Sequence, residues 1–144
     1  MITYKELKDR QEAEVNAFPL GFAFSNRQFE EMMIGWGLTK DDTDQIYRLG
    51  STGGFYRRSD AGSLHELFAR HEAERATAIA DDKIGEGYTY QMFAYELANH
   101  EYGYTRDFEQ TLDALELTLE QIQSDPKLRR GLNKALKKYG GRRV

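Results

Sequence analysis

The chain has 144 residues and a mass of 16.7 kDa, with 40% hydrophobic and 12% aromatic residues, enough apolar material for one folded domain rather than a disordered chain. It contains no cysteine, which excludes disulfide scaffolds, thiolate zinc sites, cysteine nucleophiles and iron–sulfur clusters. The formal net charge is −4, and because no signal-peptide pattern or membrane-spanning apolar run is present, we expect a cytoplasmic protein without membrane partners.

The first part of the chain predicts a helix followed by an extended segment. Thr3 and Glu6 form a capping-box pattern, which predicts a helix over residues 4–17. The apolar run over residues 18–24 is short and interrupted by Pro and Gly. It predicts a buried extended segment or an edge strand.

A second capping-box pattern, Ser25 with Gln28, predicts another helix that ends near Gly37. Its apolar residues recur at the spacing of one helical face: Phe29, Met32, Met33 and Trp36. Residues 39–44 carry N-cap side chains and predict one further short turn.

Residues 46–49 and 55–58 are short β-like runs on either side of a glycine-rich segment, which predicts a β-hairpin. The segment could also present backbone N–H groups to a phosphate. The candidate binding residues are Gly50, Gly53, Gly54, Arg57 and Arg58. A strand follows the glycines where a P-loop requires a helix, so a hairpin turn is the favoured interpretation.

The remaining sequence predicts four helices, over residues 60–80, 88–101, 107–123 and 126–139, with a linker at 81–87. The expected fold is therefore α+β. We predict a mostly helical single domain over residues 1–144, with a small β-hairpin or sheet packed on about five helices.

Charge is strongly polarised along the chain. All 24 acidic residues lie at or before Asp125, and eight of the 20 basic residues follow it. Residues 1–125 carry 12 basic and 24 acidic side chains, a net charge of −12, and residues 126–144 carry +8. We therefore distinguish an acidic body, 1–125, from a basic C-terminal helix and tail, 126–144. Such asymmetry is typical of an interaction segment.

Three interpretations of this asymmetry stay open. The basic end could bind a phosphate backbone, through Lys127, Arg129, Arg130, Lys134, Lys137 and Lys138. The acidic body could present a potential like that of nucleic acid to a basic partner. Alternatively, the basic residues complement the helix dipole and dock onto the protein's own acidic body.

Three histidines allow a direct check for catalytic and metal sites. Glu96 and His100 are four residues apart and share a helical face, and His71 with Glu74 could complete a metal site. Such pairs are frequent in a chain with 24 carboxylates, so ordinary solvated or paired side chains are favoured. We predict no catalytic residue, metal or cofactor.

Aromatic residues crowd a 17-residue window: Tyr88, Tyr90, Phe93, Tyr95, Tyr102 and Tyr104. Phe93 is expected in the core. The tyrosines could form a binding face, or a core in which each hydroxyl reaches the surface.

Several strings resemble one family of small proteins of unknown function that is associated with mobile genetic elements and phages of gut bacteria. The strings are Asn16–Pro19, Phe22–Ser25 with Gln28-Phe29, Tyr47–Gly50, Gly53–Phe55, Asn99–Gly103 and Thr111–Leu115. The resemblance implies an accessory protein with no established activity. It points to the Gly50–Phe55 turn and to Asn99, His100, Glu101 and Tyr102 as places for a site.

The expected function is a non-enzymatic interaction protein with a protein or nucleoprotein partner, most concretely an inhibitor of a host defence system. Nucleic-acid binding through the basic C-terminal helix is the alternative. A small enzyme built around Glu96 and His100 is the third hypothesis.

Overall fold

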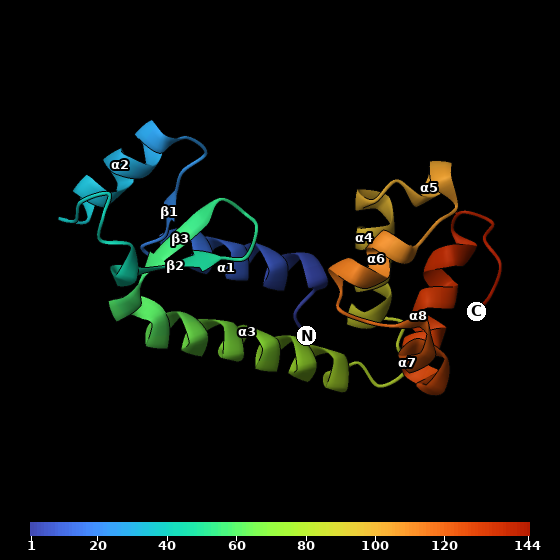
Figure 1. Cartoon of the computed structure of the whole chain (residues 1–144). Coiled ribbons are helices and arrows are strands. Elements are labelled where there is room, and N and C mark those ends of the chain that lie inside the picture. The colour runs from blue at the N-terminus through green and yellow to red at the C-terminus, as the bar shows by residue number, and fades with distance from the viewer. The chain divides into compact units, whose positions relative to one another are not determined.

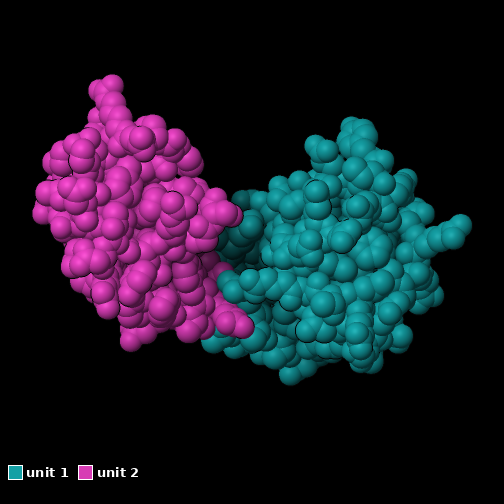
Figure 2. Space-filling model, in the orientation of Figure 1, with its two compact units in different colours: residues 1–10, 73–144 teal, residues 11–72 magenta.

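The computed structural model describes residues 1–144 and contains eight α-helices and one small antiparallel sheet, which confirms the predicted mostly helical α+β fold (Figure 1). The chain forms two compact units (Figure 2). Unit 1 comprises residues 1–10 and 73–144, and unit 2 comprises residues 11–72. None of the helices is both long and apolar enough to cross a lipid bilayer.

Unit 2 holds the sheet, together with parts of the long helices α1 (Tyr4–Ala17) and α3 (Ala61–Asp81). Its other elements, in chain order, are β1 (Gly21–Phe22), α2 (Asn26–Gly35), η1 (Thr43–Gln45), β2 (Ile46–Leu49), β3 (Gly54–Arg57) and η2 (Arg58–Asp60). The strand order is β1-β3-β2, with both pairs antiparallel. The predicted hairpin is confirmed as β2 and β3.

Of the two alternatives for residues 18–24, the structure shows the edge strand, β1, and not a buried segment. Phe22 is 54% exposed and Phe24 is 75% exposed. The buried apolar side chains of this unit lie outside residues 18–24: Met33 of α2, Ile46 of β2 and Leu64 of α3.

The N-terminus of α2 is capped nearly as predicted. Ser25 Oγ accepts a hydrogen bond from the Gln28 backbone N–H at 3.2 Å. Gln28 Oε1, however, accepts from the backbone N–H of Phe24 at 2.7 Å instead of that of Ser25. The reciprocal bond is therefore shifted by one residue.

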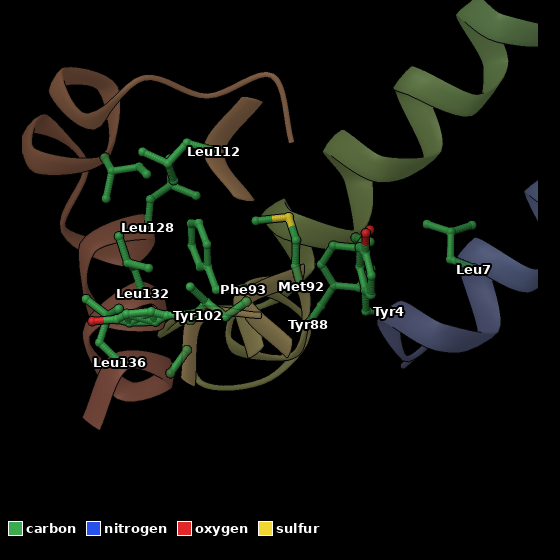
Figure 3. Packing of buried hydrophobic residues seen from close by; sticks show 14 residues of the cluster. Tyr4, Leu7, Tyr88, Met92, Phe93, Tyr102, Leu112, Leu128, Leu132 and Leu136 are labelled. Carbon is green, nitrogen blue, oxygen red and sulfur yellow. The ribbon is translucent and has the colours of Figure 1, made fainter. Parts of the chain in front are cut away.

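Unit 1 is helical. Besides the ends of α1 and α3, it contains α4 (Tyr88–Asn99), α5 (Tyr102–Thr105), α6 (Glu109–Ala114), α7 (Leu119–Ser124) and α8 (Pro126–Lys137). Helices α4 and α8 pack side by side. Figure 3 shows Leu128, Leu132 and Leu136 of α8 pointing toward Phe93 of α4, in a cluster that also includes Tyr4 and Leu7 of α1.

The prediction of one helix over residues 107–123 is wrong. The chain forms two short helices there, α6 and α7, separated by Glu116 in the left-handed conformation (φ 57°). Thr118 and Gln121 then form a reciprocal capping box that starts α7. The helical spacing of the apolar residues does not indicate this break in the sequence, because residues of both short helices pack on the same core.

The predicted linker at residues 81–87 consists of the last residue of α3 and an ordered turn over residues 82–87. The buried carboxylate of Asp82 accepts hydrogen bonds from the backbone N–H groups of Gly85 (3.2 Å), Gly87 (3.3 Å) and Thr89 (2.9 Å). Burial acts to raise the pKa of Asp82, but these donors outweigh it and hold that pKa below its usual value. Asp82 therefore fixes the entry into α4.

Candidate nucleic-acid interface

Helix α8 has one apolar face, which anchors it to unit 1. Asp125 Oδ1 accepts from the backbone N–H groups of Lys127 (2.9 Å) and Leu128 (3.3 Å), which makes Asp125 the predicted N-cap before Pro126. The buried side chains recur at helical spacing: Leu128, Leu132, Ala135 and Leu136. The sequence pattern in this segment therefore predicted both the helix and its inner face.

Gly131 sets how closely α8 approaches α4. A Cβ at this position would lie 2.8 Å from Thr89 Cγ2 and 2.9 Å from the carbonyl oxygen of Gly85. Only glycine leaves room for this approach without a shift of the neighbouring backbone. Close packing of this face against α4 leaves the opposite face of α8 exposed to solvent.

The outward face of α8 lines a groove of about 640 Å³. Five of the lining residues are cations: Arg129, Arg130, Lys134, Lys137 and Arg143. Glu86 is the only acidic residue in the lining, and its carboxylate lies 3.9 Å from Lys134 Nζ. The same Nζ lies 4.6 Å from the centroid of the Tyr90 ring. The groove is therefore strongly cationic.

The basic residues at this end of the chain have few partners among the protein's own acids. Of the eight that follow Asp125, only Lys134 has a carboxylate oxygen within 4.0 Å. The acidic body therefore neutralises only one of these basic side chains, through the weak Lys134–Glu86 pair. A surface pair of this kind contributes about 0–1 kcal/mol.

The last residues fold back onto α8 and complete the groove. Gly140 adopts a positive φ (69°), and the Gly141 N–H donates to the carbonyl oxygen of Leu136 at 2.9 Å, which closes the helix. Asn133 Oδ1 accepts from the Val144 N–H at 2.7 Å. These contacts place Arg143 in the lining.

Four of the six predicted basic-tail residues line the groove: Arg129, Arg130, Lys134 and Lys137. Lys127 has a structural role, because its Nζ donates to the carbonyl oxygen of Ile79 in the last turn of α3 at 2.7 Å. Lys138 is exposed outside the groove. The contribution of Arg143 was missed, since nothing in the sequence indicates that the tail returns to the helix.

The glycine-rich turn between β2 and β3 lies in unit 2 and has a structural explanation. Gly50 (φ 56°) and Gly53 (φ 79°) both need positive φ, and a Cβ at Gly53 would overlap the Phe24 ring. Gly54 is buried in β3. Of the two arginines predicted to assist, Arg57 pairs with Asp60 (Nε–Oδ2 2.8 Å), and Arg58 is exposed.

The string Asn99–Gly103 joins α4 to α5 in unit 1. Glu101 has a positive φ (58°) and occupies the N-cap position of α5, while Asn99 is exposed. Tyr102 is buried, with its ring 5.6 Å from that of Tyr139 and 6.3 Å from that of Phe108. Tyr102 of this segment therefore packs in the core, while Asn99 and Glu101 lie on the surface. The segment lies in a different unit from the glycine-rich turn.

Glu96 and His100 come together as their spacing predicted, with Oε2 and Nε2 3.4 Å apart. The buried Glu96 carboxylate also accepts a hydrogen bond from the Tyr4 hydroxyl at 2.7 Å and lies 3.6 Å from Lys8 Nζ. Burial, followed by the contact with Glu96, raises the pKa of Tyr4. The ammonium and hydroxyl groups satisfy this carboxylate, so the cluster is explained as a tie between α1 and α4.

The tyrosine-rich window divides between core and surface. Tyr88 and Tyr102 are buried, and Tyr90 packs half-buried against the core. Tyr95 and Tyr104 are exposed. Phe93 lies in the core as expected. The tyrosines therefore do not form one continuous binding face.

Comparison with known proteins gives a family without an assigned activity. The sequence model described as "Family of unknown function (DUF7659)" matches residues 3–138, so the chain belongs to this family. No curated protein and no solved structure matches the chain.

Proposed function

We propose that this member of the DUF7659 family binds the phosphate backbone of nucleic acid through the cationic groove on α8. The observation that carries the proposal is the lining itself, with five cations, one acid and a single weak ion pair. Backbone phosphates supply the anions that this surface lacks, and arginine and lysine are the side chains that bind them.

The groove favours binding that does not depend on base sequence. Its polar side chains are long cations together with Asn133, and the amide of Asn133 is already hydrogen-bonded to Val144. The ring of Tyr90 is covered by Lys134. With no free stacking ring or base-reading amide, affinity would come from phosphate contacts.

A binding assay with charge-reversed protein tests the proposal. Fluorescence anisotropy with labelled 20-nucleotide DNA and RNA, single- and double-stranded, is measured at 50 mM salt for the wild type and for the R129E/R130E variant. We expect the variant to bind at least tenfold more weakly. Both arginines are exposed, so the fold should be retained, as circular dichroism can check.

The control is K83E, which reverses one exposed lysine of unit 1 outside the groove and is compared with R130E, a single reversal inside it. K83E should bind like the wild type, and R130E more weakly. If the wild type binds none of these nucleic acids, or if R130E or R129E/R130E binds as well as K83E, the proposal is refuted.

The wider setting is also a proposal: a cytoplasmic accessory protein of a mobile genetic element or phage of gut bacteria, acting on a protein or nucleoprotein partner as an inhibitor of a host defence system. The strings at Tyr47–Phe55 and Asn99–Gly103 support it through their resemblance to such proteins. Its test is expression in a host with an active defence system. Unchanged defence, with no partner enriched on the tagged chain, would contradict it.

A further inference from the structure

Unit 2 contains a separate cleft of about 550 Å³ between the start of α2 and the sheet. Four aromatic residues contribute to its lining: Phe24, Phe29, Tyr47 and Phe55. Phe29 and Phe55 contact each other edge to face, with ring centroids 5.5 Å apart. The volume is within the range of pockets that hold small ligands or the anchoring side chain of a partner.

One of these rings is exposed to a degree that the fold itself does not require, since Phe24 is 75% exposed. Tyr47 lines the cleft at its position in β2, but its ring packs against Tyr56 on the other face of the sheet from Arg48 and Phe55. Phe24 follows the edge strand β1, and its ring rests on the turn at Gly53, where a Cβ would overlap it. The lack of a side chain at Gly53 therefore leaves room for the Phe24 ring at the rim of the cleft.

Arg48 of β2 is the one charged residue in the lining. Its guanidinium lies 5.8 Å from the centroid of the Phe55 ring and has no carboxylate oxygen within 4.0 Å. A guanidinium that rests on an aromatic ring keeps its N–H donors available for a planar, bidentate contact with a carboxylate. The cleft thus offers apolar walls beside one unpaired positive charge.

We propose that this cleft docks an extended segment of a partner protein that carries a large apolar side chain next to one aspartate or glutamate. The apolar side chain would fill the aromatic cleft, and the carboxylate would pair with Arg48. Tyrosine, phenylalanine and arginine are the residues enriched at protein–protein interfaces. The proposal is independent of the α8 groove, which belongs to unit 1.

Charge favours a peptide over nucleic acid at this cleft. Unit 2 carries ten acidic and six basic residues, whereas a phosphate backbone needs several cations along its path. Asp42 and Asp44 flank the lining residue Thr43 and would repel a chain of phosphates. A single carboxylate beside an apolar side chain meets Arg48 without bringing further negative charge near these aspartates.

Blocked hexapeptides titrated into the ¹⁵N-labelled full chain provide the test. The probe carries Phe-Glu at its centre, and the comparison peptides carry Phe-Gln, Phe-Lys or Ala-Glu. We expect Phe-Glu to shift the amide signals of Phe24, Tyr47, Arg48 and Phe55. Its Kd should be at least threefold lower than that of Phe-Lys, and Ala-Glu should cause no shift.

R48E should invert the order, so that Phe-Lys binds more tightly than Phe-Glu. K40E, the matched control, reverses an exposed lysine of the same unit outside the cleft and should keep the wild-type order. Arg48 is exposed, so R48E should fold, and the dispersion of its spectrum checks this. Absence of shifts, an order unchanged by R48E, or stronger shifts of the same signals by a thymidine decamer would overturn the proposal.

Discussion

The salt dependence of nucleic-acid binding follows directly from the composition of the α8 groove. Each phosphate that a cation neutralises releases condensed counterions, which lowers the slope of log K against log salt by about 0.7 for single strands and about 0.9 for B-DNA. The groove has five cations, so five phosphates is the upper limit. The limiting slopes are therefore about −3.5 for single strands and about −4.5 for duplex DNA.

These slopes predict large changes over an accessible range of salt. Between 50 and 200 mM, affinity should fall by at most about 100-fold for single strands and about 500-fold for duplex DNA. Neutralising two cations in R129Q/R130Q should make the slope shallower by about 1.4 or 1.8, respectively. The change should be the same whatever the base sequence of the probe.

Anisotropy titrations at four salt concentrations measure both slopes. K83Q removes one positive charge from an exposed position outside the groove and should leave the slope unchanged. A wild-type slope near zero would show that binding is not driven by phosphates. An R129Q/R130Q slope equal to that of the wild type would show that the contact lies elsewhere on the chain.

Three predictions concern the packing of unit 1. Leu132→Ala removes a fully buried side chain and should lower the free energy of unfolding by about 2–5 kcal/mol in urea titrations, while an unchanged midpoint would contradict the docking of α8. Tyr4→Phe leaves the buried Glu96 carboxylate without its hydroxyl donor and should cost about 1–3 kcal/mol by the same measurement, with retention of wild-type stability as the contrary result. The pKa of Asp82 is lowered in the folded state, so its contribution to the free energy of unfolding is complete above the pKa of the unfolded state and is lost as pH falls through the pKa of the folded state. Asp82→Asn should therefore be less stable than the wild type at pH 7, and the two stabilities should converge in acid. A stability difference that stays constant down to low pH would refute this.

The parts of the fold that could be predicted from sequence are those with an unambiguous periodicity. Helix α8 has leucines at a spacing of four, an Asp-Pro start and a Gly-Gly end, and each of these local signals agrees with its packing. Residues 107–123 also have helical spacing, yet the chain breaks at Glu116. The Thr118-to-Gln121 capping-box pattern indicates a new helix start, whereas the spacing of the leucines alone predicts one continuous helix.

The groove itself could be predicted only in part. Its floor is one face of a predicted helix, so Arg129, Arg130, Lys134 and Lys137 followed from helical geometry. Its flanks come from Glu86, which is distant in sequence, and from a tail held by Asn133. Contacts of that kind depend on tertiary structure and leave no periodic trace in the sequence.

The absence of acidic residues from α8 is the most informative feature of its outward face. Helix α1 pairs Lys5 with Asp9, and α2 pairs Arg27 with Glu31, each through an i,i+4 contact. Helix α8 could have used the same arrangement, since an acid four residues from a basic side chain costs nothing in packing and adds about 0.2–0.5 kcal/mol. It has none, although like charges along one face repel each other. Packing of α8 by its apolar face does not explain why its outward cations lack acidic partners, and this observation supports the proposal that the surface binds a polyanion.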